Sequence, residues 1–311
     1  MFKTFDEIQA FIVQKGIKKK VALAAAHDDD ALSSVVAAKR AGIITAVLVG
    51  RTEETKKLLK DMGEEPADWE IIEASDEAVC AKTAMQLVAD GKADIPMKGI
   101  MQTPAFLKAV FSKAYGFVRE GTLVSQATVC EYTAENRLMI ITDCAINIAP
   151  TYEDKIKIIN NAVKLAKDLG CDMPKVAVLA PVEVVNPAIP STIEAAMLSK
   201  ACDRGQIKGC IVDGPFGLDN AVSEDAARHK NITSEVAGKA DILIMPDLAA
   251  GNIFTKSLHY FARLKTAGTA QGPDVPAVFS SRTDTATDKF NAILVAVLQA
   301  CGRHHADLHD N

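Results

Sequence analysis

A serine, an arginine and two aspartates lie close together near the end of the chain, in the stretch SSRTDTATD (280–288). An apolar run, PAVF, precedes them, and an apolar pattern with helical spacing follows from Phe290 to Cys301. An arginine between a strand and a helix amino terminus gains nothing from the helix dipole, whereas its planar guanidinium fits phosphate or carboxylate. Arg282 is therefore a candidate anion-binding residue.

Asp288 allows two interpretations. Thr285 and Asp288 have the spacing of a capping box, and an acid in the first turn of a helix is stabilised by the dipole by about 0.3–1 kcal/mol. A functional role beside Ser281 and Arg282, which closely precede it, is the alternative. Composition alone favours the structural interpretation.

Two further junctions between a predicted strand and a helix carry residues suited to an anion. In MPDLAAGNIF, Gly251 would let the backbone approach a ligand, and Asn252 would lead into free N–H groups. In MKGIMQTP, Lys98 and Gly99 stand at a strand end, and Thr103 is placed to begin a helix. Together with Arg282, these junctions favour a phosphorylated or CoA-like substrate.

The elements that must position these residues follow an α/β pattern. Short β-branched or Ala-rich runs alternate with amphipathic stretches, which is typical of βαβ units and mostly parallel sheets. Eight or more strands are many for one open sheet, so the 311 residues are predicted to form two three-layer α/β lobes. The predicted strands are VALAAA (from 21), TAVLVG (45), ADIPMKG (93), RLMIITD (137), KVAVLAP (175), GCIVDGP (209), ADILIMPD (240) and PAVFSS (276).

The segments 116–122 and 265–276 are rich in Gly, Pro and Thr, and we expect them to connect the lobes. The first domain is thus predicted to comprise residues 1–120 plus 272–311, and the second residues 121–271. The last strand then rejoins the first lobe, and its Ser-Arg end faces an active-site cleft between the domains. Open α/β sheets bind ligands beyond the carboxyl ends of their strands.

Composition argues against several classes of function. A formal charge of −5 disfavours nucleic-acid binding. The chain has no apolar run of roughly 18 residues and no secretory signal pattern at its start, so no membrane contact and a cytoplasmic location are expected. Neither the seven cysteines nor the six histidines, three of them in the tail (His304, His305, His309), form a metal-binding pattern. Dinucleotide, Walker and nucleophile-elbow motifs are absent.

Five stretches resemble the phosphate acetyltransferase and phosphate butyryltransferase family, and the butyryl branch most closely. They cover most of residues 95–300. The resemblance implies two α/β domains with a cleft between them, in a cytoplasmic homodimer or larger homo-oligomer. The stretches are MKGIMQTPAFLKAV, ITDCAINIAPTYEDK, the block from PKVAVLAP to SEDAARHK, EVAGKADILIMPDLAAGNIFTKSL and PAVFSSRTDTATDK.

The resemblance also implies the reaction, in which acyl-CoA and phosphate exchange with acyl phosphate and CoA. Coenzyme A is then a substrate, and no metal or other cofactor takes part. In the family a Ser-Arg pair and an Asp six residues beyond the Arg form the catalytic site; these positions are Ser281, Arg282 and Asp288 here. Where acetyl-branch members have an arginine that helps to hold CoA, this chain has Lys108, which keeps the charge but loses the fork. The expected substrate-binding residues are Gly251, Asn252, Thr103, Lys98 and Lys108.

The chemistry suggests a role for each catalytic residue. A thiol with a pKa of about 8.5 is mostly protonated at neutral pH, so its attack on an acyl phosphate needs a base. Asp288 is the expected base, although an aspartate is weak unless its surroundings strengthen it. Arg282 would neutralise the phosphate, and Ser281 would donate a hydrogen bond to the phosphate or the oxyanion.

A short-chain acyl-CoA, with butyryl-CoA expected, is the first hypothesis for the substrate. The alternatives are a phosphate acetyltransferase, acyl transfer through a covalent intermediate on Cys144 or Cys210, and a noncatalytic module that senses CoA or acyl phosphate. No histidine lies beside either cysteine in the sequence. One methylene group discriminates by only about 1–3 kcal/mol, so the sequence does not determine the preferred chain length.

Overall fold

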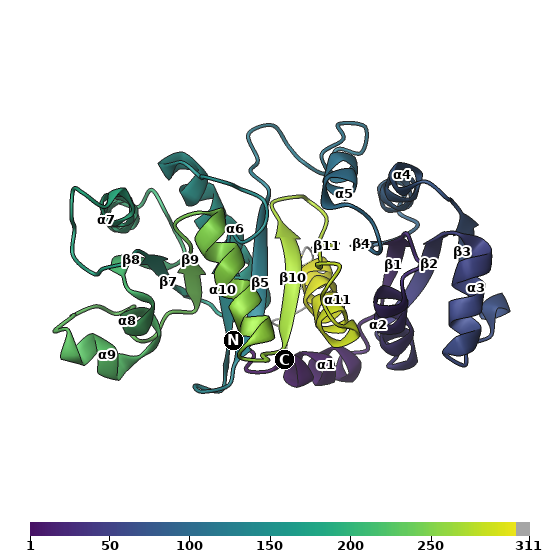
Figure 1. Ribbon diagram of the computed structural model, residues 1–311, viewed down its shortest axis with the longest axis horizontal. Helices are drawn as coiled ribbons and strands as arrows, with labels where there is room; N and C mark the ends of the chain where they lie inside the picture. Colours follow the sequence, from purple (N-terminus) through teal and green to yellow (C-terminus); the bar gives the residue numbers. More distant parts are fainter. Residues whose placement is uncertain (303–311) are drawn as a thin grey trace. The chain divides into compact units, whose positions relative to one another are not determined.

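The computed structural model describes residues 1–302, and their contacts divide the chain into two compact units (Figure 1). The N-terminal unit comprises Phe5–Thr122 and the described residues from Lys265 onward; the central unit comprises Met1–Thr4 and Leu123–Leu264. The domain limits expected near residues 121 and 272 stay a prediction. The tail with His304, His305 and His309 lies outside the described residues.

The N-terminal unit contains strands in the order β3-β2-β1-β4-β11-β10. Its neighbouring strands are parallel, except for the antiparallel pair of β10 and β11. The strands are β1 (Lys19–Ala24), β2 (Ile44–Gly50), β3 (Glu70–Glu73), β4 (Ile95–Lys98), β10 (Thr266–Gln271) and β11 (Ala277–Val278).

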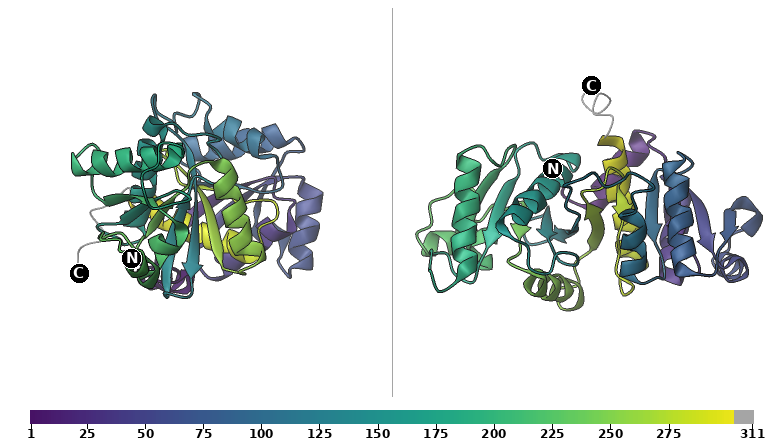
Figure 2. Two further views of the ribbon diagram at one scale, coloured as in Figure 1. Left: turned by 60° about the vertical axis from the view of Figure 1, so that its left-hand side comes forward. Right: turned by 90° about the horizontal axis from the view of Figure 1, so that it is seen from above.

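Helices cover both faces of this sheet. One group, α1, α2 and α11, packs together on one side of the strands, and α4 and α5 pack together on the other (Figure 1), with further views in Figure 2. The layers agree with the predicted three-layer architecture. The helices of this unit are α1 (Phe5–Gln14), α2 (Asp29–Arg40), α3 (Thr52–Asp61), the short 3-10 helix η1 (Pro66–Asp68), α4 (Glu77–Ala89), α5 (Thr103–Val110) and α11 (Ala286–Cys301).

The central unit repeats this layering with the strand order β5-β6-β9-β7-β8. Strands β5 and β6 form an antiparallel hairpin, and the other neighbours are parallel. The strands are β5 (Ser125–Tyr132), β6 (Arg137–Thr142), β7 (Lys175–Leu179), β8 (Ile211–Phe216) and β9 (Ile242–Ile244). The helices are α6 (Tyr152–Asp168), α7 (Pro190–Asp203), α8 (Leu218–Val222), α9 (Glu224–His229) and α10 (Leu248–Tyr260).

The predicted α/β class with mostly parallel sheets is confirmed, and each of the eight predicted runs contains a strand. Strands β3, β5 and β10 were not among the predictions. The interpretation of 265–276 as a connection is wrong for Thr266–Gln271, because these residues form β10 and all of them are buried. Within residues 1–302, no helix is long and apolar enough to cross a membrane.

Candidate functional site

Three parallel neighbours of the N-terminal unit end at the same edge of the sheet. Ala24 at the end of β1 lies opposite Lys98 at the end of β4, and Met97 lies opposite Val278 of β11. The loop after β11 carries Ser281 and Arg282. The expected meeting of a lysine with the Ser-Arg pair therefore follows directly from parallel pairing.

Gly99 is needed where β4 leaves the sheet. A Cβ atom on this residue would lie 2.4 Å from the carbonyl oxygen of Ala25 and 2.7 Å from that of Ala24. Backbone atoms cannot give way as the end of a flexible side chain can, so only glycine allows this approach. The glycine thus keeps the ends of β1 and β4 close together.

The Ser281–Arg282 segment forms a hydrogen-bonded turn. The Ser281 N–H donates to Asp284 Oδ2 at 2.7 Å, and the Asp284 N–H donates to the Ser281 carbonyl at 3.2 Å. The Thr283 N–H lies 3.4 Å from Ser281 Oγ. Asp284 therefore stabilises the turn, while Arg282 is exposed and has no ion pair within residues 1–302.

Asp288 is both the partner in a capping box and a buried carboxylate. Its Oδ2 accepts hydrogen bonds from Thr285 Oγ1 at 2.6 Å and from the Thr285 N–H at 3.2 Å, and its own N–H donates to Thr285 Oγ1. Its Oδ1 accepts from the Thr266 N–H at 2.9 Å and from Thr266 Oγ1 at 3.0 Å. The side chain is only 4% exposed. The capping interpretation is confirmed, and the carboxylate also ties α11 to the start of β10.

Lys98 is among the largest fully buried side chains of the protein, with 2% of its surface exposed. Burial away from water, together with the nearby cations Lys289 and Arg282, lowers the pKa of its ammonium group to about 8. Asp28 and Asp284 act in the opposite direction. Lys98 is therefore a charged group that folding holds in an unfavourable environment.

Lys289 is a site residue that the sequence analysis missed. It follows Asp288 in the first turn of α11, is 1% exposed, and donates a hydrogen bond to the Asp284 carbonyl. Its local sequence, TDKFN, does not distinguish it from an exposed lysine at the start of an amphipathic helix. The packing of α11 against α2 and β10 is what buries it.

Thr103 begins helix α5, as expected, but the N-cap residue is Gln102. The Gln102 N–H donates to Glu77 Oε2 at 2.8 Å, so a carboxylate already occupies part of this helix terminus. Lys108 is exposed in the last turn of the same helix, at the end opposite to Thr103. The structure thus separates these two residues along α5.

The expectation that Asn252 leads into free helix N–H groups is wrong. Helix α10 begins at Leu248 with Asp247 as its N-cap, so both residues lie inside the helix and do not offer free N–H groups. A Cβ atom on Gly251 would lie 2.4 Å from the Asp143 carbonyl oxygen. The glycine therefore allows close helix packing within the central unit. The Asn252 side chain donates to the Cys144 carbonyl at 3.2 Å.

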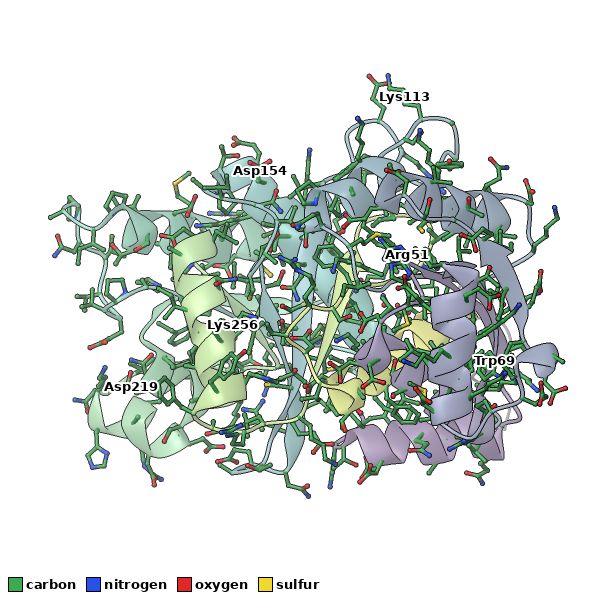
Figure 3. All side chains as sticks on the ribbon, turned by 45° about the vertical axis from the view of Figure 1, so that its right-hand side comes forward. Arg51, Trp69, Lys113, Asp154, Asp219 and Lys256 are labelled. Carbon is green, nitrogen blue, oxygen red and sulfur yellow. The ribbon has the colours of Figure 1, made fainter. Side chains whose placement is uncertain are left out.

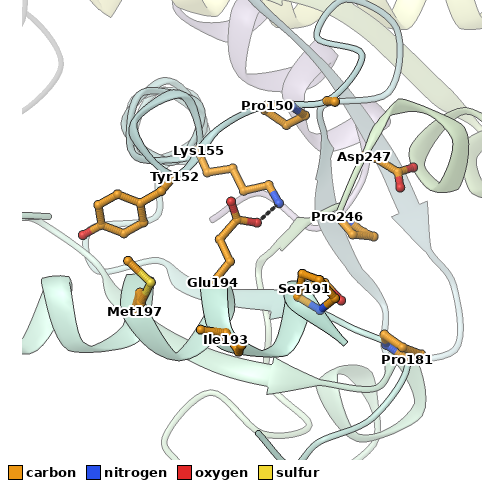
Figure 4. A pocket seen from close by; sticks show the side chains of 12 residues that line it. Pro150, Tyr152, Lys155, Pro181, Ser191, Ile193, Glu194, Met197, Pro246 and Asp247 are labelled. Carbon is orange, nitrogen blue, oxygen red and sulfur yellow. Dashed lines mark hydrogen bonds and ion pairs between the residues drawn. The ribbon is translucent and has the colours of Figure 1, made fainter. Parts of the chain in front are cut away.

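A pocket of about 690 Å³ lies at the carboxyl ends of strands in the central unit (Figure 4). Lys155 from α6 and Glu194 from α7 point toward each other across it and form an ion pair, while Pro181, Ile193 and other apolar side chains line its wall. Because its buried lysine is already paired with a carboxylate, this pocket is less suited to phosphate than the edge around Lys98.

The structure gives no support to a cysteine nucleophile. Burial raises the pKa of Cys210 to about 12 and holds the pKa of Cys144 well above its usual value. A thiol attacks as its thiolate, and both groups remain protonated at neutral pH.

Replacing Lys98 should change stability in a pH-dependent way. The pKa of about 8 in the folded protein lies below the ordinary 10.5, so the unfolded chain binds more protons between these values. We expect Lys98→Met to be more stable than the wild type at pH 7, by on the order of 3 kcal/mol, and this advantage to shrink as the pH rises from about 8.

Urea unfolding at a series of pH values measures this difference. Lys57→Met, at an exposed lysine of α3, is the control and should show no such trend. A Lys98→Met protein that is less stable than wild type by the same amount at every pH would contradict the account.

Comparison with known proteins agrees with the resemblance seen in the sequence. The family model for phosphate acetyl/butaryl transferase matches residues 73–297. A phosphate butyryltransferase of Clostridium acetobutylicum is 45% identical over 96% of this chain and 99% of its own length. A phosphate acetyltransferase of Thermotoga maritima is 43% identical over 92% of this chain and 97% of its own length.

A solved structure shows the same fold. A branched-chain phosphotransacylase from Enterococcus faecalis V583 superposes with a TM-score of 0.79 at 32% identity, covering 91% of this chain and 99% of its own. The family match spans both compact units and the edge that carries Lys98, Ser281 and Arg282. The chain is a transferase that belongs to the phosphate acetyl/butaryl transferase family.

Proposed function

We propose that this phosphate acyltransferase interconverts butyryl-CoA and phosphate with butyryl phosphate and CoA, and that Ser281, Arg282 and Asp288 catalyse the exchange. The observation that carries the proposal is the parallel sheet edge, where a Ser-Arg turn lies beside the buried ammonium of Lys98. This edge offers positive charge and hydrogen-bond donors to a phosphate. Phosphate acyltransfer is the activity of the family, and the names of the most similar relatives favour a short acyl chain.

In this proposal Arg282 binds the phosphate, because it is exposed and its guanidinium has no ion pair within the described residues. The Ser281 hydroxyl, in the same turn, donates to the phosphate or to the tetrahedral oxyanion. Lys98, whose ammonium group donates to the Ser280 carbonyl, supplies further positive charge. Thr103 at the start of α5 and Gly251 and Asn252 in α10 are assigned to the phosphate and acyl end of the substrate. Lys108, in the last turn of α5, is assigned to CoA.

Asp288 is proposed as the base that accepts the thiol proton of CoA. The carboxylate is buried, but Thr285 is exposed and its hydroxyl donates to Asp288 Oδ2 at 2.6 Å. A proton can thus reach the carboxylate through this hydroxyl without displacing Asp288. The thiolate then attacks the acyl carbonyl, and phosphate leaves while Arg282 neutralises its charge.

An acetyl-specific enzyme and a noncatalytic sensor of CoA or acyl phosphate are the other readings of the same site. The first is kept because a relative of nearly equal identity is a phosphate acetyltransferase. The cytoplasmic location and the homo-oligomeric state stay predictions, as does catalysis without a metal or other cofactor.

Release of CoA thiol from acyl-CoA, with and without inorganic phosphate, tests the proposed activity. We expect phosphate-dependent release that is faster with butyryl-CoA than with acetyl-, propionyl- or branched acyl-CoA. A single methylene group changes the rate by roughly 10–200-fold in a fitted pocket. Absence of phosphate-dependent release with every short acyl-CoA would refute the enzyme, and a preference for acetyl-CoA would select the acetyl branch.

Asp288→Asn should lower turnover by roughly 10²–10⁴-fold, the usual contribution of a general base. Asp154→Asn is a matched control, because Asp154 (labelled in Figure 3) forms the same capping box with Thr151 at the start of α6. Both variants should lose cap stability, by about 0.5–2 kcal/mol, and Asp288→Asn somewhat more because its single amide oxygen cannot accept from both Thr285 and Thr266.

Melting temperature and turnover on this pair separate the two roles of Asp288. If both variants lose stability and both keep normal turnover, the carboxylate is a helix cap without a catalytic role.

Arg282→Lys should raise the KM for phosphate by roughly tenfold, although the charge is retained, because an ammonium group cannot form the paired hydrogen bonds of a guanidinium. Arg204→Lys, at an exposed arginine after α7, is the control. Steady-state rates against phosphate concentration give the comparison. An unchanged phosphate dependence in Arg282→Lys would remove this residue from the binding site.

A further inference from the structure

The ammonium group of Lys98 is a buried charge with weak partners. It donates to the Ser280 carbonyl at 3.4 Å and to the Gly99 carbonyl at 3.5 Å, both longer than the usual 2.7–3.2 Å. Within residues 1–302, no carboxylate lies within 4.0 Å of it. An ammonium has three donors and is costly to bury without a strong acceptor. A dianion bound at this edge would supply the missing partner.

The charges around Lys98 leave the cluster positive. Lys289 on α11 and Arg282 in the turn add two cations, and Asp284 in the turn and Asp28 before α2 add two anions. Both acids are already used, since Asp284 accepts from the Ser281 N–H and Asp28 caps α2 by accepting from the Ala31 N–H at 3.3 Å. With Lys98 charged, the three cations of the cluster exceed its two anions and leave a net positive charge.

We propose that Lys98 is the proton-accepting group that couples phosphate binding to pH, so that the phosphate dianion draws one proton onto this lysine as it binds. The inference rests on the proposed function, which names phosphate as a substrate. In this binding reaction, the protein with a neutral Lys98 takes up one phosphate dianion and one proton from solvent, and the proton binds to Lys98. Lys98 is then not a fixed positive charge, because the bound phosphate stabilises its protonated form.

The linkage follows from the surroundings of the lysine. With a pKa of about 8, Lys98 is half neutral at that pH in the free protein. A bound dianion favours the charged form and raises the pKa of this ammonium group. Phosphate affinity should then fall as the pH rises above about 8, by up to about tenfold per pH unit.

Lys289 sets where this fall begins. Its ammonium is held on the Asp284 carbonyl, and its like charge makes the proton on Lys98 harder to keep. Without the charge of Lys289, the free protein should hold its proton on Lys98 to a higher pH. The same proton uptake should then appear at higher pH in Lys289→Met.

Titration calorimetry with inorganic phosphate, in pairs of buffers that differ in ionisation enthalpy, counts the protons taken up on binding. Between about pH 8 and 9.5 phosphate is already a dianion, so uptake reports on the protein. We expect about 0.5 proton at pH 8, rising toward one at pH 9, for the wild type and for the exposed control Lys57→Met. Lys98→Met should show none, and Lys289→Met should show the same rise at higher pH.

Two results would overturn the inference: binding to the wild type without proton uptake, and equal uptake in Lys98→Met. Circular dichroism confirms that each variant is folded. If Lys98→Met does not fold, Lys289→Met still tests the inference. Proton uptake that rises over the same pH range as in the wild type would contradict the proposed coupling. Turnover without proton uptake would refute this inference alone. Lys98-dependent proton uptake without thiol release from any acyl-CoA would instead refute the proposed function.

Discussion

Parallel pairing of β1, β4 and β11 is the constraint that brings the chemical groups of this protein together. Because the three strands run in the same direction and are neighbours, Lys98 and the Ser281–Arg282 turn meet at one edge, although they are far apart in the sequence. Gly99 allows the strand ends to approach, and Asp288 joins α11, the helix that follows the turn, to β10. The site is therefore a consequence of sheet topology.

Burial of charge at this edge opposes folding and favours binding. Lys98 loses its hydration without gaining a carboxylate, which lowers the pKa of its ammonium group to about 8. The central unit provides a contrast, because its buried Lys155 forms an ion pair with Glu194. The charge of Lys155 is compensated without a ligand, whereas the ammonium group of Lys98 can still bind an anion. Stability given up at a binding site in this way is a common consequence of function.

Local patterns were sufficient to predict much of the fold but little of its packing. The α/β class, the strands with apolar runs and the capping box of Thr285 follow from short-range rules, and all are present. Strand β10 was missed because TAGTAQ has small residues and a glycine, and its pairing with β11 cannot be read from the local sequence. The burial of Lys289 likewise arises from the packing of α11. At α10, the N-cap Asp247 starts the helix before Gly251 and Asn252, so the N–H groups that were expected to be free near Asn252 lie inside the helix.

The position at which phosphate binds decides whether the Ser281–Arg282 turn forms the phosphate site. In a crystal structure determined after soaking with inorganic phosphate, we expect an anion beside the turn. Its oxygen atoms should lie about 3 Å from the Arg282 guanidinium and the Ser281 hydroxyl, near the ammonium group of Lys98. Phosphate bound only in the central pocket beside Lys155, with the Ser281–Arg282 turn empty, would contradict this expectation.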